Sequence, residues 1–258
     1  MSEVRSVKQG HLTFWYGIDQ GTQEWLDFRK NYATCSNAGL VCDKGVKSAL
    51  EANRQHATRK TPNATEYTER GHVLEDEIKQ ILEGYFNNDV HSMINCSFVT
   101  NDKYPIGGYS PDGIIIDTET QKFIAPVEVK CFNDWTWETV PLSSRRIKRW
   151  SYKHKLCCED VNNIPLENRL QFEMEMLMTD TWELVVVLYN PDAEEGVPKL
   201  KIHKYTPFVM KKDDGKPHFV FRERLAERLS DNGVKTTPID EALQRWAERS
   251  KLDPPVFG

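Results

Sequence analysis

The sequence predicts a mixed α/β (α+β) fold in which helices flank a central mixed β-sheet. Two strand patterns lie next to each other in the middle of the chain, at residues 112–117 and 122–131, joined by the turn TETQ. A nearly continuous apolar segment at 182–190, WELVVVLYN, is typical of a strand that is buried on both faces. Segments with helical spacing precede and follow these strands, as expected for a sheet covered by helices.

Two helical segments are expected before residue 60. Residues 22–30 have the pattern of a short helix whose Trp25 and Phe28 face inward. Residues 36–56 form a further helical region.

The strongest helical pattern covers residues about 70–87. Its apolar residues recur at helical spacing and cluster on one face of the helix. They are Leu74, Ile78, Ile81, Leu82 and Tyr85. Glu75 and Glu77 lie on the two flanks of this face. We therefore expect one of these two glutamates to reach over the edge of the sheet while the helix packs against it.

Further strands are expected on either side of the central pair. Residues 92–100, SMINCSFVT, form a strand pattern before the pair, and residues 199–206, KLKIHKYT, form one after it. Pro126 interrupts the pattern of the second central strand. Because proline cannot donate a hydrogen bond to a neighbouring strand, it predicts a sheet edge or a bulge at this point.

A long basic segment and a helix separate the central pair from the buried strand. The segment covers residues about 132–164. Pro165 begins a helix that extends to about residue 179. The apolar side of this helix consists of Leu166, Leu170, Met174 and Leu177. The helix is therefore expected to pack against the sheet.

The chain is expected to form one domain, residues 1–258. Its composition, with 39% hydrophobic and 28% charged residues, is that of a globular protein, and no Pro- or Gly-rich linker divides it. The domain carries the basic insertion at about 132–164 and a C-terminal helical extension at about 220–258. Pro238 begins the last helix, with Asp240 in its first turn.

Membrane and secreted classes are not expected. The chain has no run of about 18 apolar residues, and the N-terminal segment MSEVRSVKQGH lacks the apolar core of a signal peptide. We therefore predict a cytoplasmic protein. The six cysteines form no C-x-x-C pair, so we expect reduced, mostly buried thiols and no zinc site.

The net charge of −5 differs from that of a generic nucleic-acid binder, which is basic. Any contact with DNA must therefore come from local basic patches. The clearest patch lies in the basic insertion, where Trp150 and Tyr152 stand among the cations. Its basic residues are Arg145, Arg146, Lys148, Arg149, Lys153 and Lys155. Such interleaving suits binding to a single strand or to the backbone; a solvated loop is the alternative.

Acidic and basic side chains are concentrated on the two central strands. In VEVK the side chains alternate, so Glu128 and Lys130 share one face while Val127 and Val129 share the other. Asp112 stands at the start of the preceding strand, after a Ser-Pro turn. Because the connection is short, the two strands are expected to pair, and Asp112 and Glu128 could then meet at one edge of the sheet.

These groups have the chemistry of a magnesium site. Two carboxylates and the backbone carbonyl of Val129 are hard oxygen ligands of the kind that Mg²⁺ prefers. Such a metal polarises a phosphoryl oxygen and lowers the pKa of a bound water, and Lys130 beside that water would stabilise the developing charge. The pattern therefore predicts phosphodiester hydrolysis. A surface salt bridge between Glu128 and Lys130 is the alternative.

The chain also resembles a known nuclease family. SPDG followed by VEVK is similar to the PD-(D/E)XK nuclease signature. The segments QEWLDFRKNYATCSNAG, RGHVLEDEI, GGYSPDGI, VEVKC and RLQFEMEMLMTD occur in the order seen in the lambda-exonuclease (YqaJ-type) phage recombination nucleases. The resemblance covers about residues 20–190 and implies a restriction-endonuclease-like core.

The resemblance implies catalytic roles for five residues. Asp112 and Glu128 are similar to the metal-binding acids of the family, and Lys130 is similar to the motif lysine. Glu75, in GHVLE, is similar to the helix-borne acid that completes the metal site, which favours it over the other flanking glutamate. Gln171, in RLQFEM, is similar to the helix glutamine that approaches the active site; an amide on a helix flank is the alternative.

The resemblance also implies a pocket for the 5′ phosphate of DNA. Arg29 and Ser36 in FRKNYATCS, with Ser110 in YSPDG, are similar to the residues of that pocket. Guanidinium groups and hydroxyls bind phosphate well, in agreement with this assignment. A terminal phosphate held next to a metal would select a DNA end. A salt bridge within the helix is the alternative role for Arg29, and Trp25 is expected to pack rather than to contact bases.

The resemblance implies partners and a cofactor. The cofactor is Mg²⁺, for which Mn²⁺ can substitute, and the cysteines do not follow the pattern of relatives with iron–sulfur clusters. The partners are DNA ends and a single-strand annealing protein, in the cytoplasm of the bacterial host if the gene belongs to a phage. The family's ring-shaped trimer is a further expectation, although the segment between Lys130 and Gln171 is longer than in the family and could reshape the subunit interface.

Together these features predict a metal-dependent 5′-to-3′ exonuclease on linear double-stranded DNA that leaves 3′ single strands for recombination by annealing. An endonuclease or structure-specific nuclease on the same core is the nearest alternative. A non-catalytic DNA-binding module is a second, and the intact set Glu75, Asp112, Glu128 and Lys130 argues against it. A hydrolase of small phosphate substrates is a third, but the chain has no glycine-rich phosphate loop.

Overall fold

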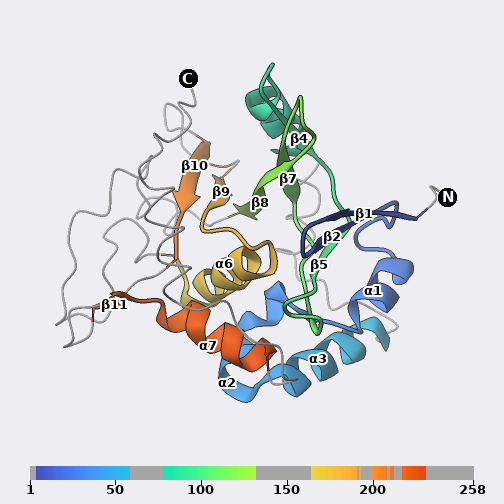
Figure 1. Ribbon diagram of the computed structural model, residues 1–258, viewed down its shortest axis with the longest axis vertical. Coiled ribbons are helices and arrows are strands. Elements are labelled where there is room, and N and C mark those ends of the chain that lie inside the picture. The colour runs from blue at the N-terminus through green and yellow to red at the C-terminus, as the bar shows by residue number, and fades with distance from the viewer. Residues whose placement is uncertain are drawn as a thin grey trace.

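A five-stranded mixed sheet forms the centre of the molecule, with strand order β10-β9-β8-β7-β4 (Figure 1). The computed structural model describes residues 4–58, 78–131, 164–190, 192, 199–207, 210–211 and 217–230. Helix α6 (Leu166–Met178) lies between this sheet and the helices α2 (Ala38–Lys44) and α7 (Val220–Leu229), and contacts all three. The predicted mixed α/β fold, with helices flanking a central sheet, is confirmed.

The central strands position the predicted residues Asp112, Glu128 and Lys130. Strands β7 (Gly113–Asp117) and β8 (Phe123–Cys131) pair antiparallel, as predicted, with Gly113 opposite Val127. Strand β9 (Leu184–Tyr189) is parallel to β8 and buried along its whole length, as its apolar sequence indicates. Strand β10 (Leu200–Tyr205) pairs antiparallel with β9. Strand β8 therefore lies in the middle of the sheet.

Pro126 does not mark an edge of the sheet, because β8 has a neighbour on each side. Ile115 pairs with Ala125, but the next residue of β7 pairs with Phe123, so Ile124 is an extra residue in β8. Pro126 itself is in register opposite Ile114, two residues from this bulge. The second strand therefore contains a bulge, but not at the proline, and the alternative of a sheet edge is wrong.

The single strand predicted at 92–100 is wrong, since two strands occupy this segment. Strand β4 (His91–Ile94) pairs with β7 in the central sheet. Strand β5 (Phe98–Asn101) belongs to a second sheet, with β1 (Arg5–Gln9) and β2 (Leu12–Tyr16). The chain crosses between the sheets where the Ser97 N–H donates to the Trp15 carbonyl, at 2.9 Å. We did not predict the hairpin formed by β1 and β2.

The N-terminal helices begin and end at identifiable residues. Helix α1 (Gln23–Arg29) confirms the first predicted helix, and the Thr22 hydroxyl caps it by accepting from the Trp25 N–H. The predicted region 36–56 contains the short 3₁₀ turn η1 (Cys35–Asn37), then α2, then α3 (Val46–Thr58). Gly45 separates α2 from α3 with φ +88°, a value that few other residues adopt.

Only the second half of the strong helical pattern, 78–86, lies within the described residues, where it is helical. Ile78 and Leu82 are buried as predicted, and Phe86 continues their line. Ile81 and Tyr85 are 40% and 44% exposed, so their predicted place in the core is wrong. The buried residues of this helix are therefore spaced four apart, and they pack against the central sheet in one cluster with residues of β4, β7, β8 and β9. The three residues Leu74, Glu75 and Glu77 lie outside the described residues.

Helix α6 confirms the prediction for residues 165–179 and has two buried sides. Leu170 and Met174 pack toward α2 and α7, whereas Phe172 and Met176 pack toward β9. Leu166 is half exposed because the first turn extends beyond this core, so its predicted place on the buried side is wrong. Burial on both sides leaves little room for polar groups on α6, and those present need partners.

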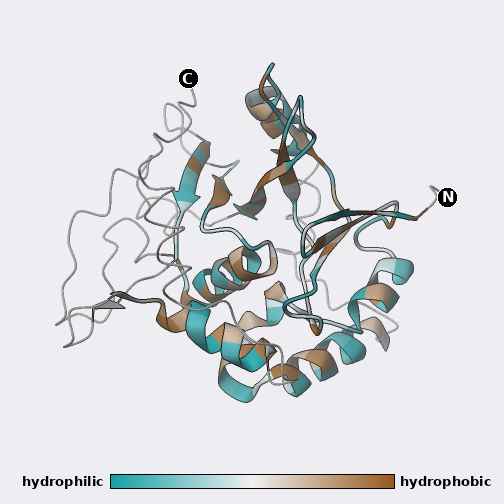
Figure 2. Cartoon of the chain, viewed as in Figure 1, coloured by the Kyte–Doolittle hydropathy of each residue, from teal (hydrophilic) through white to brown (hydrophobic). Residues whose placement is uncertain are grey.

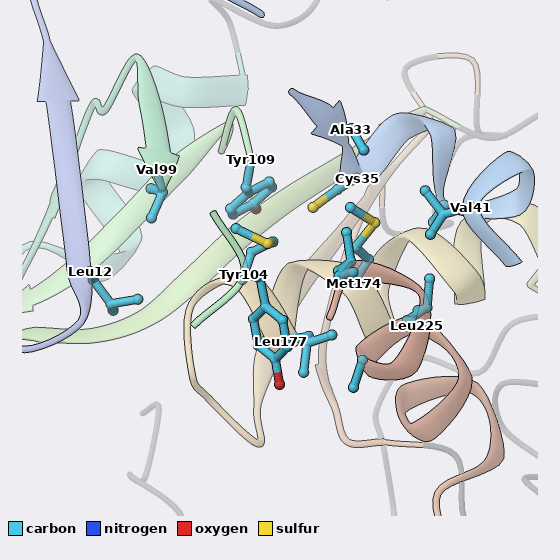
Figure 3. Packing of buried hydrophobic residues seen from close by; sticks show 14 of the residues in the cluster. Leu12, Ala33, Cys35, Val41, Val99, Tyr104, Tyr109, Met174, Leu177 and Leu225 are labelled. Atoms are coloured by element: carbon cyan, nitrogen blue, oxygen red, sulfur yellow. The ribbon is translucent and has the colours of Figure 1, made fainter. Parts of the chain in front are cut away.

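The hydrophobic residues follow these layers. Figure 2 shows them gathered along β7, β8 and β9, while the helices carry hydrophilic residues on their outer sides. Figure 3 shows part of the cluster between the two sheets and the helices, in which Cys35, Tyr109 and Met174 lie close together. Among the described cysteines, Cys131 is exposed and the other three are buried free thiols.

Two short pairings complete the described structure. They are β11 (Met210–Lys211) with β12 (Pro217–His218), and β3 (Ala33–Thr34) with β6 (Gly107–Gly108). None of the described helices combines the length and apolarity needed to cross a bilayer. The basic insertion and the helix predicted to begin at Pro238 lie outside the described residues.

Candidate active site

The sheet register brings Asp112 to strand β8. Because Gly113 pairs with Val127, the residue before it reaches the neighbouring segment of β8. An oxygen of the Asp112 carboxylate, Oδ2, accepts from the Val129 N–H at 2.7 Å. The structure thus places the Asp112 carboxylate against the backbone on which Glu128 and Lys130 stand, as expected from the sequence.

Glu128 and Lys130 form a close ion pair, with 2.7 Å between Oε1 and Nζ. The Glu128 side chain is only 5% exposed, so the pair is not the surface salt bridge weighed above. Burial by itself lowers the pKa of Lys130, but Glu128, Asp112 and Glu175 outweigh it and raise the pKa above its usual range. The lysine is therefore held charged by the acids around it.

Gln171 projects from α6 to the same carboxylate. Its Nε2 donates to Oε1 of Glu128 at 2.6 Å and to Oε1 of Glu175 at 2.7 Å. Both amide hydrogens thus have a carboxyl acceptor, one on the strand and one on the helix itself. The structure brings Gln171 into the group of Asp112, Glu128 and Lys130, which is different from an amide on a solvated helix flank.

Two residues that we did not single out from the sequence complete this group. The Tyr109 hydroxyl donates toward the Val127 carbonyl and Oε2 of Glu128, each at 3.4 Å. Glu175 is fully buried, and burial followed by the charge of Glu128 raises its pKa well above the usual range. The spacing of Gln171 and Glu175, four residues apart on a helix, is the signal that could have indicated the second residue.

The donor set fits a hard divalent metal. Asp112 and Glu128 offer carboxylate oxygens, and the Val129 carbonyl stands between Glu128 and Lys130 in sequence, in agreement with Mg²⁺ chemistry. Within the part of the chain that the structure describes, no group of three His, Cys, Asp or Glu side chains is arranged to hold a metal. The third predicted acid, Glu75, lies outside the described residues, so the described part supplies two acids of the predicted three.

Arg29 lies in a separate pocket at the end of α1. Its Nη2 donates to the Ser36 hydroxyl at 2.6 Å and to the Thr34 hydroxyl at 3.2 Å, and its Cζ lies 4.2 Å from the centre of the Trp25 ring. Burial lowers the pKa of Arg29 to about 10. Arg29 Nε meets no hydrogen-bond acceptor among the described residues. We call Arg29, Thr34 and Ser36 the arginine cradle.

The arginine cradle and the acidic group are neighbours. Cys35 follows Thr34 of the cradle, and its thiol donates to the Gly108 carbonyl, in the segment that leads to Asp112, at 3.5 Å. Burial raises the pKa of this thiol, the charges of Glu175 and Glu128 raise it further, and Arg29 lowers it. Ser110, the third residue of the predicted pocket, has a buried hydroxyl oxygen without a hydrogen-bond partner among the described residues. The structure therefore does not join Ser110 to Arg29 or Ser36 by a hydrogen bond.

The double glycine of GGYSPDG explains how the two groups come so close. Strand β6 runs parallel to β3, with Gly108 paired to Thr34, so the segment before Asp112 lies beside the cradle. A Cβ atom on Gly108 would collide with the Phe98 ring, and one on Gly107 would collide with the Met178 side chain. Only glycine permits this close approach of β6 to its neighbours.

The basic cluster Arg145, Arg146, Lys148 and Arg149 lies outside the described residues, and so does Glu75. The structure therefore does not relate them to either group. The residues predicted from the sequence that the structure brings together are Asp112, Glu128, Lys130 and Gln171 in one group and Arg29 with Ser36 in the other. Tyr109, Glu175 and the buried Thr34 were not predicted.

Comparison with known proteins assigns the chain to a family. The structure resembles an alkaline exonuclease (LHK-Exo) from Laribacter hongkongensis, with 20% identity over 89% of this chain and 100% of that chain and a TM-score of 0.47. The structure of LHK-Exo in complex with dAMP gives 20% identity, the same coverage and a TM-score of 0.45. No curated protein sequence matches the chain. The YqaJ-like viral recombinase domain matches residues 24–181, which is more than half of the chain, and the protein therefore belongs to the YqaJ-like viral recombinase family.

Proposed function

We propose that the protein is a metal-dependent deoxyribonuclease that degrades linear double-stranded DNA from its 5′ ends and leaves 3′ single strands. The observation that carries the proposal is the adjacency of the acid–lysine group, in which Glu128 is buried, and the arginine cradle, in which Thr34 is buried and paired with the segment before Asp112. The first group has the composition of a phosphodiester-cleaving site, and the second has the composition of a phosphate-binding site. A nuclease that binds a terminal phosphate beside its reacting centre acts at ends.

The acid group supports metal binding. Asp112, Glu128 and the Val129 carbonyl would hold Mg²⁺ together with Glu75, and Mn²⁺ can substitute because it accepts the same oxygen ligands. When bound, the metal would polarise a phosphoryl oxygen and lower the pKa of a water. This oxygen-rich set contains no thiolate or imidazole, which zinc sites usually include.

The chain's own residues would orient the reacting groups. Lys130 and Gln171 both donate to Oε1 of Glu128, which restricts the rotation of its carboxylate. The Tyr109 hydroxyl contacts the other oxygen, Oε2. Lys130 retains further N–H bonds with which to stabilise charge that develops on the scissile phosphate. A carboxylate held at both oxygens keeps its geometry without a cost of reorganisation.

The arginine cradle supports selection of a 5′-phosphorylated end. Arg29 is a buried cation with two hydroxyl acceptors, and no carboxylate forms an ion pair with it in the described part of the chain. A phosphate would supply the missing negative charge and an acceptor for the guanidinium. Ser110 belongs to the same proposed pocket, with its buried hydroxyl available to a ligand oxygen.

The wider biological role follows from the family. We propose that residues 1–258 form one nuclease domain, that the basic insertion with Arg145 and Arg146 contacts DNA, and that a single-strand annealing protein uses the exposed 3′ strand. A homo-oligomer, such as a ring-shaped trimer, would keep the enzyme on one DNA molecule. These parts of the proposal rest on membership of a viral recombinase family.

The proposal is tested with linear duplex DNA labelled at either the 5′ or the 3′ end of one strand, incubated with Mg²⁺. We expect early release of the 5′ label as a mononucleotide by the wild type and loss of that release, by about a thousandfold or more, in Lys130→Ala. Lys122→Ala, an exposed lysine at the start of the same strand hairpin, is the matched control. Internal fragments, or cutting of closed circles, would favour an endonuclease, and intact DNA under all these conditions would refute nuclease activity.

A further inference from the structure

A buried asparagine lies beneath the arginine cradle. Asn53, on α3, donates from Nδ2 to the Tyr32 carbonyl at 2.7 Å and to the Thr34 hydroxyl at 3.0 Å, and its Oδ1 accepts from Asn37 at 2.7 Å. A carbonyl oxygen can only accept, so the atom that faces Tyr32 must be the amide nitrogen. The orientation of the Asn53 side chain is therefore fixed by its surroundings.

This orientation decides where the Thr34 hydroxyl sends its hydrogen. A hydroxyl has two acceptor positions and one hydrogen. Arg29 and Asn53 both donate to Thr34, which fills the two acceptor positions. The hydrogen then points to Ser36, whose oxygen is 3.1 Å away. The other neighbouring acceptor, Oδ1 of Asn53, is more distant at 3.4 Å and already accepts from an amide.

Ser36 is then left with a hydrogen to give. Its oxygen accepts from Arg29 at 2.6 Å and from Thr34 at 3.1 Å, so its own hydrogen is available to a further acceptor. Asn53 and Thr34 are buried, whereas Ser36 is exposed. The chain of hydrogen bonds therefore starts in the interior and ends with an O–H group at the surface, beside a guanidinium.

We infer that Asn53 is a positioning residue for recognition of the 5′ phosphate: through Thr34 it holds Ser36 as a hydrogen-bond donor to the terminal phosphate. Asn53 does not touch the ligand itself. This inference rests on the proposed function, because it concerns the same pocket. The inference goes further than the proposed function because it explains the preference for a phosphate. An ionised phosphate only accepts hydrogen bonds, so a pocket whose groups all point their hydrogens at the ligand favours it.

Two near-isosteric substitutions reverse or break the arrangement. In Asn53→Asp the new carboxylate cannot donate, so it accepts the Thr34 hydrogen, and Thr34 in turn accepts the hydrogen of Ser36. The Ser36 hydrogen then points inward, away from the ligand. The second substitution, Thr34→Val, removes the link between Asn53 and Ser36 while it keeps the shape of the side chain. Gln23→Ala, which removes a hydrogen bond from α1 to the Ala57 carbonyl on the same helix as Asn53, is the matched control.

The experiment measures kcat/KM on duplexes that differ only in a 5′ phosphate or a 5′ hydroxyl. The ratio of the two values is the phosphate preference. We expect the preference to fall by about tenfold or more in Asn53→Asp and in Thr34→Val, because one hydrogen bond to a charged ligand is lost. Gln23→Ala should keep the wild-type ratio. Thermal unfolding followed by circular dichroism shows whether each variant folds. If Asn53→Asp does not fold, the phosphate preference of Thr34→Val tests the inference.

A double-mutant cycle separates positioning from a general loss of structure. In the Ser36→Ala background, Asn53→Asp should reduce the preference no further, since its effect passes through the Ser36 hydrogen. An additive effect, or a preference unchanged in both Asn53→Asp and Thr34→Val, overturns the inference while the proposed function stands. If the wild type itself shows no preference for a 5′ phosphate, the proposed pocket fails and the inference fails with it.

Discussion

The acidic group and the arginine cradle are adjacent but are built in opposite ways. The acidic group gathers Asp112, Glu128 and Glu175 around the single cation Lys130. The cradle surrounds the cation of Arg29 with hydroxyls and an indole ring, and no described carboxylate forms an ion pair with it. One group therefore has an excess of negative charge and suits a cation, whereas the other has unbalanced positive charge and suits an anion.

The pKa values of the two cations express the same difference. Acids raise the pKa of Lys130 although burial opposes them, while burial lowers the pKa of Arg29 to about 10 because no acid compensates it. Lys130 is thus satisfied within the protein, and Arg29 is not. A charged group that lacks its counter-ion in the protein is the stronger indication of where a charged ligand binds.

Glu128→Gln should produce the largest effect and should affect the two groups unequally. The substitution keeps the size of the side chain but removes the charge that pairs with Lys130 and would hold a metal. We expect release of mononucleotides to fall by about a thousandfold or more, while binding of a 5′-phosphorylated duplex without metal is retained. Fluorescence anisotropy measures the binding.

Glu119→Gln, in the exposed turn between β7 and β8, is the matched control for this variant. If Glu128→Gln retained activity, the acidic group would not be the reacting centre. A loss of phosphate-dependent binding in the same variant would instead show that the two groups do not act separately.

Arg29→Met should produce the second-largest effect, and this effect concerns the arginine cradle and not the acidic group. Methionine retains packing against Trp25 but has no charge and no donor for Ser36. The preference for 5′-phosphorylated over 5′-hydroxyl duplexes in kcat/KM should fall by about tenfold to a hundredfold, as expected for a lost charged hydrogen bond.

Arg5→Met provides a matched control for Arg29→Met, because Arg5 also lies over an aromatic ring, that of Tyr16, but on the exposed strand β1. The control should keep the wild-type preference. Equal losses in both variants would mean that general attraction between DNA and arginine, and not the cradle, gives the preference.

The difference between the two groups also explains what the sequence could predict. The place of Glu128 and Lys130 follows from alternation along one strand, and that of Asp112 follows from a short hairpin, so local rules suffice. The environments of Asn53 and Glu175 depend on helices α3 and α6 packing against distant segments. No spacing in the sequence specifies such contacts, and a buried acid or amide looks like a surface residue until the fold is known.

The errors in the predicted fold have the same origin. Residues 92–100 have one continuous strand pattern. The Ser97 N–H nevertheless donates a hydrogen bond to the Trp15 carbonyl, and from there the chain continues in a second sheet. Ile81 and Tyr85 have the correct helical spacing for the core, but only the row formed by Ile78, Leu82 and Phe86 meets the sheet. Periodicity predicts which side chains are able to be buried; the partners that bury them come from elsewhere in the chain.

Glu175→Gln should have the smallest effect. It should change how the free energy of unfolding depends on pH and leave the preference for a 5′ phosphate unchanged. Burial raises the pKa of Glu175 most, and the charges of Glu128 and Asp112 raise it further. Lys130 and the hydrogen bond from Gln171 lower this pKa, but they do not outweigh the other causes. Above the usual pKa of 4.5, the folded protein therefore binds a proton at Glu175 more strongly than the unfolded chain does. The contribution of this proton to stability is complete below pH 4.5 and is lost as pH rises toward the folded-state pKa.

The glutamine variant cannot titrate, so it should not lose this contribution. In metal-free protein, the free energy of unfolding measured in urea should fall from pH 5 to pH 8 for the wild type relative to Glu175→Gln, by on the order of 1 kcal/mol or more, since each unit of pKa shift corresponds to about 1.4 kcal/mol. Parallel pH profiles for the two proteins would mean that Glu175 is ionised in the folded state. Lys130 would then balance one more buried acid, and the excess of negative charge in the acidic group would be greater than inferred.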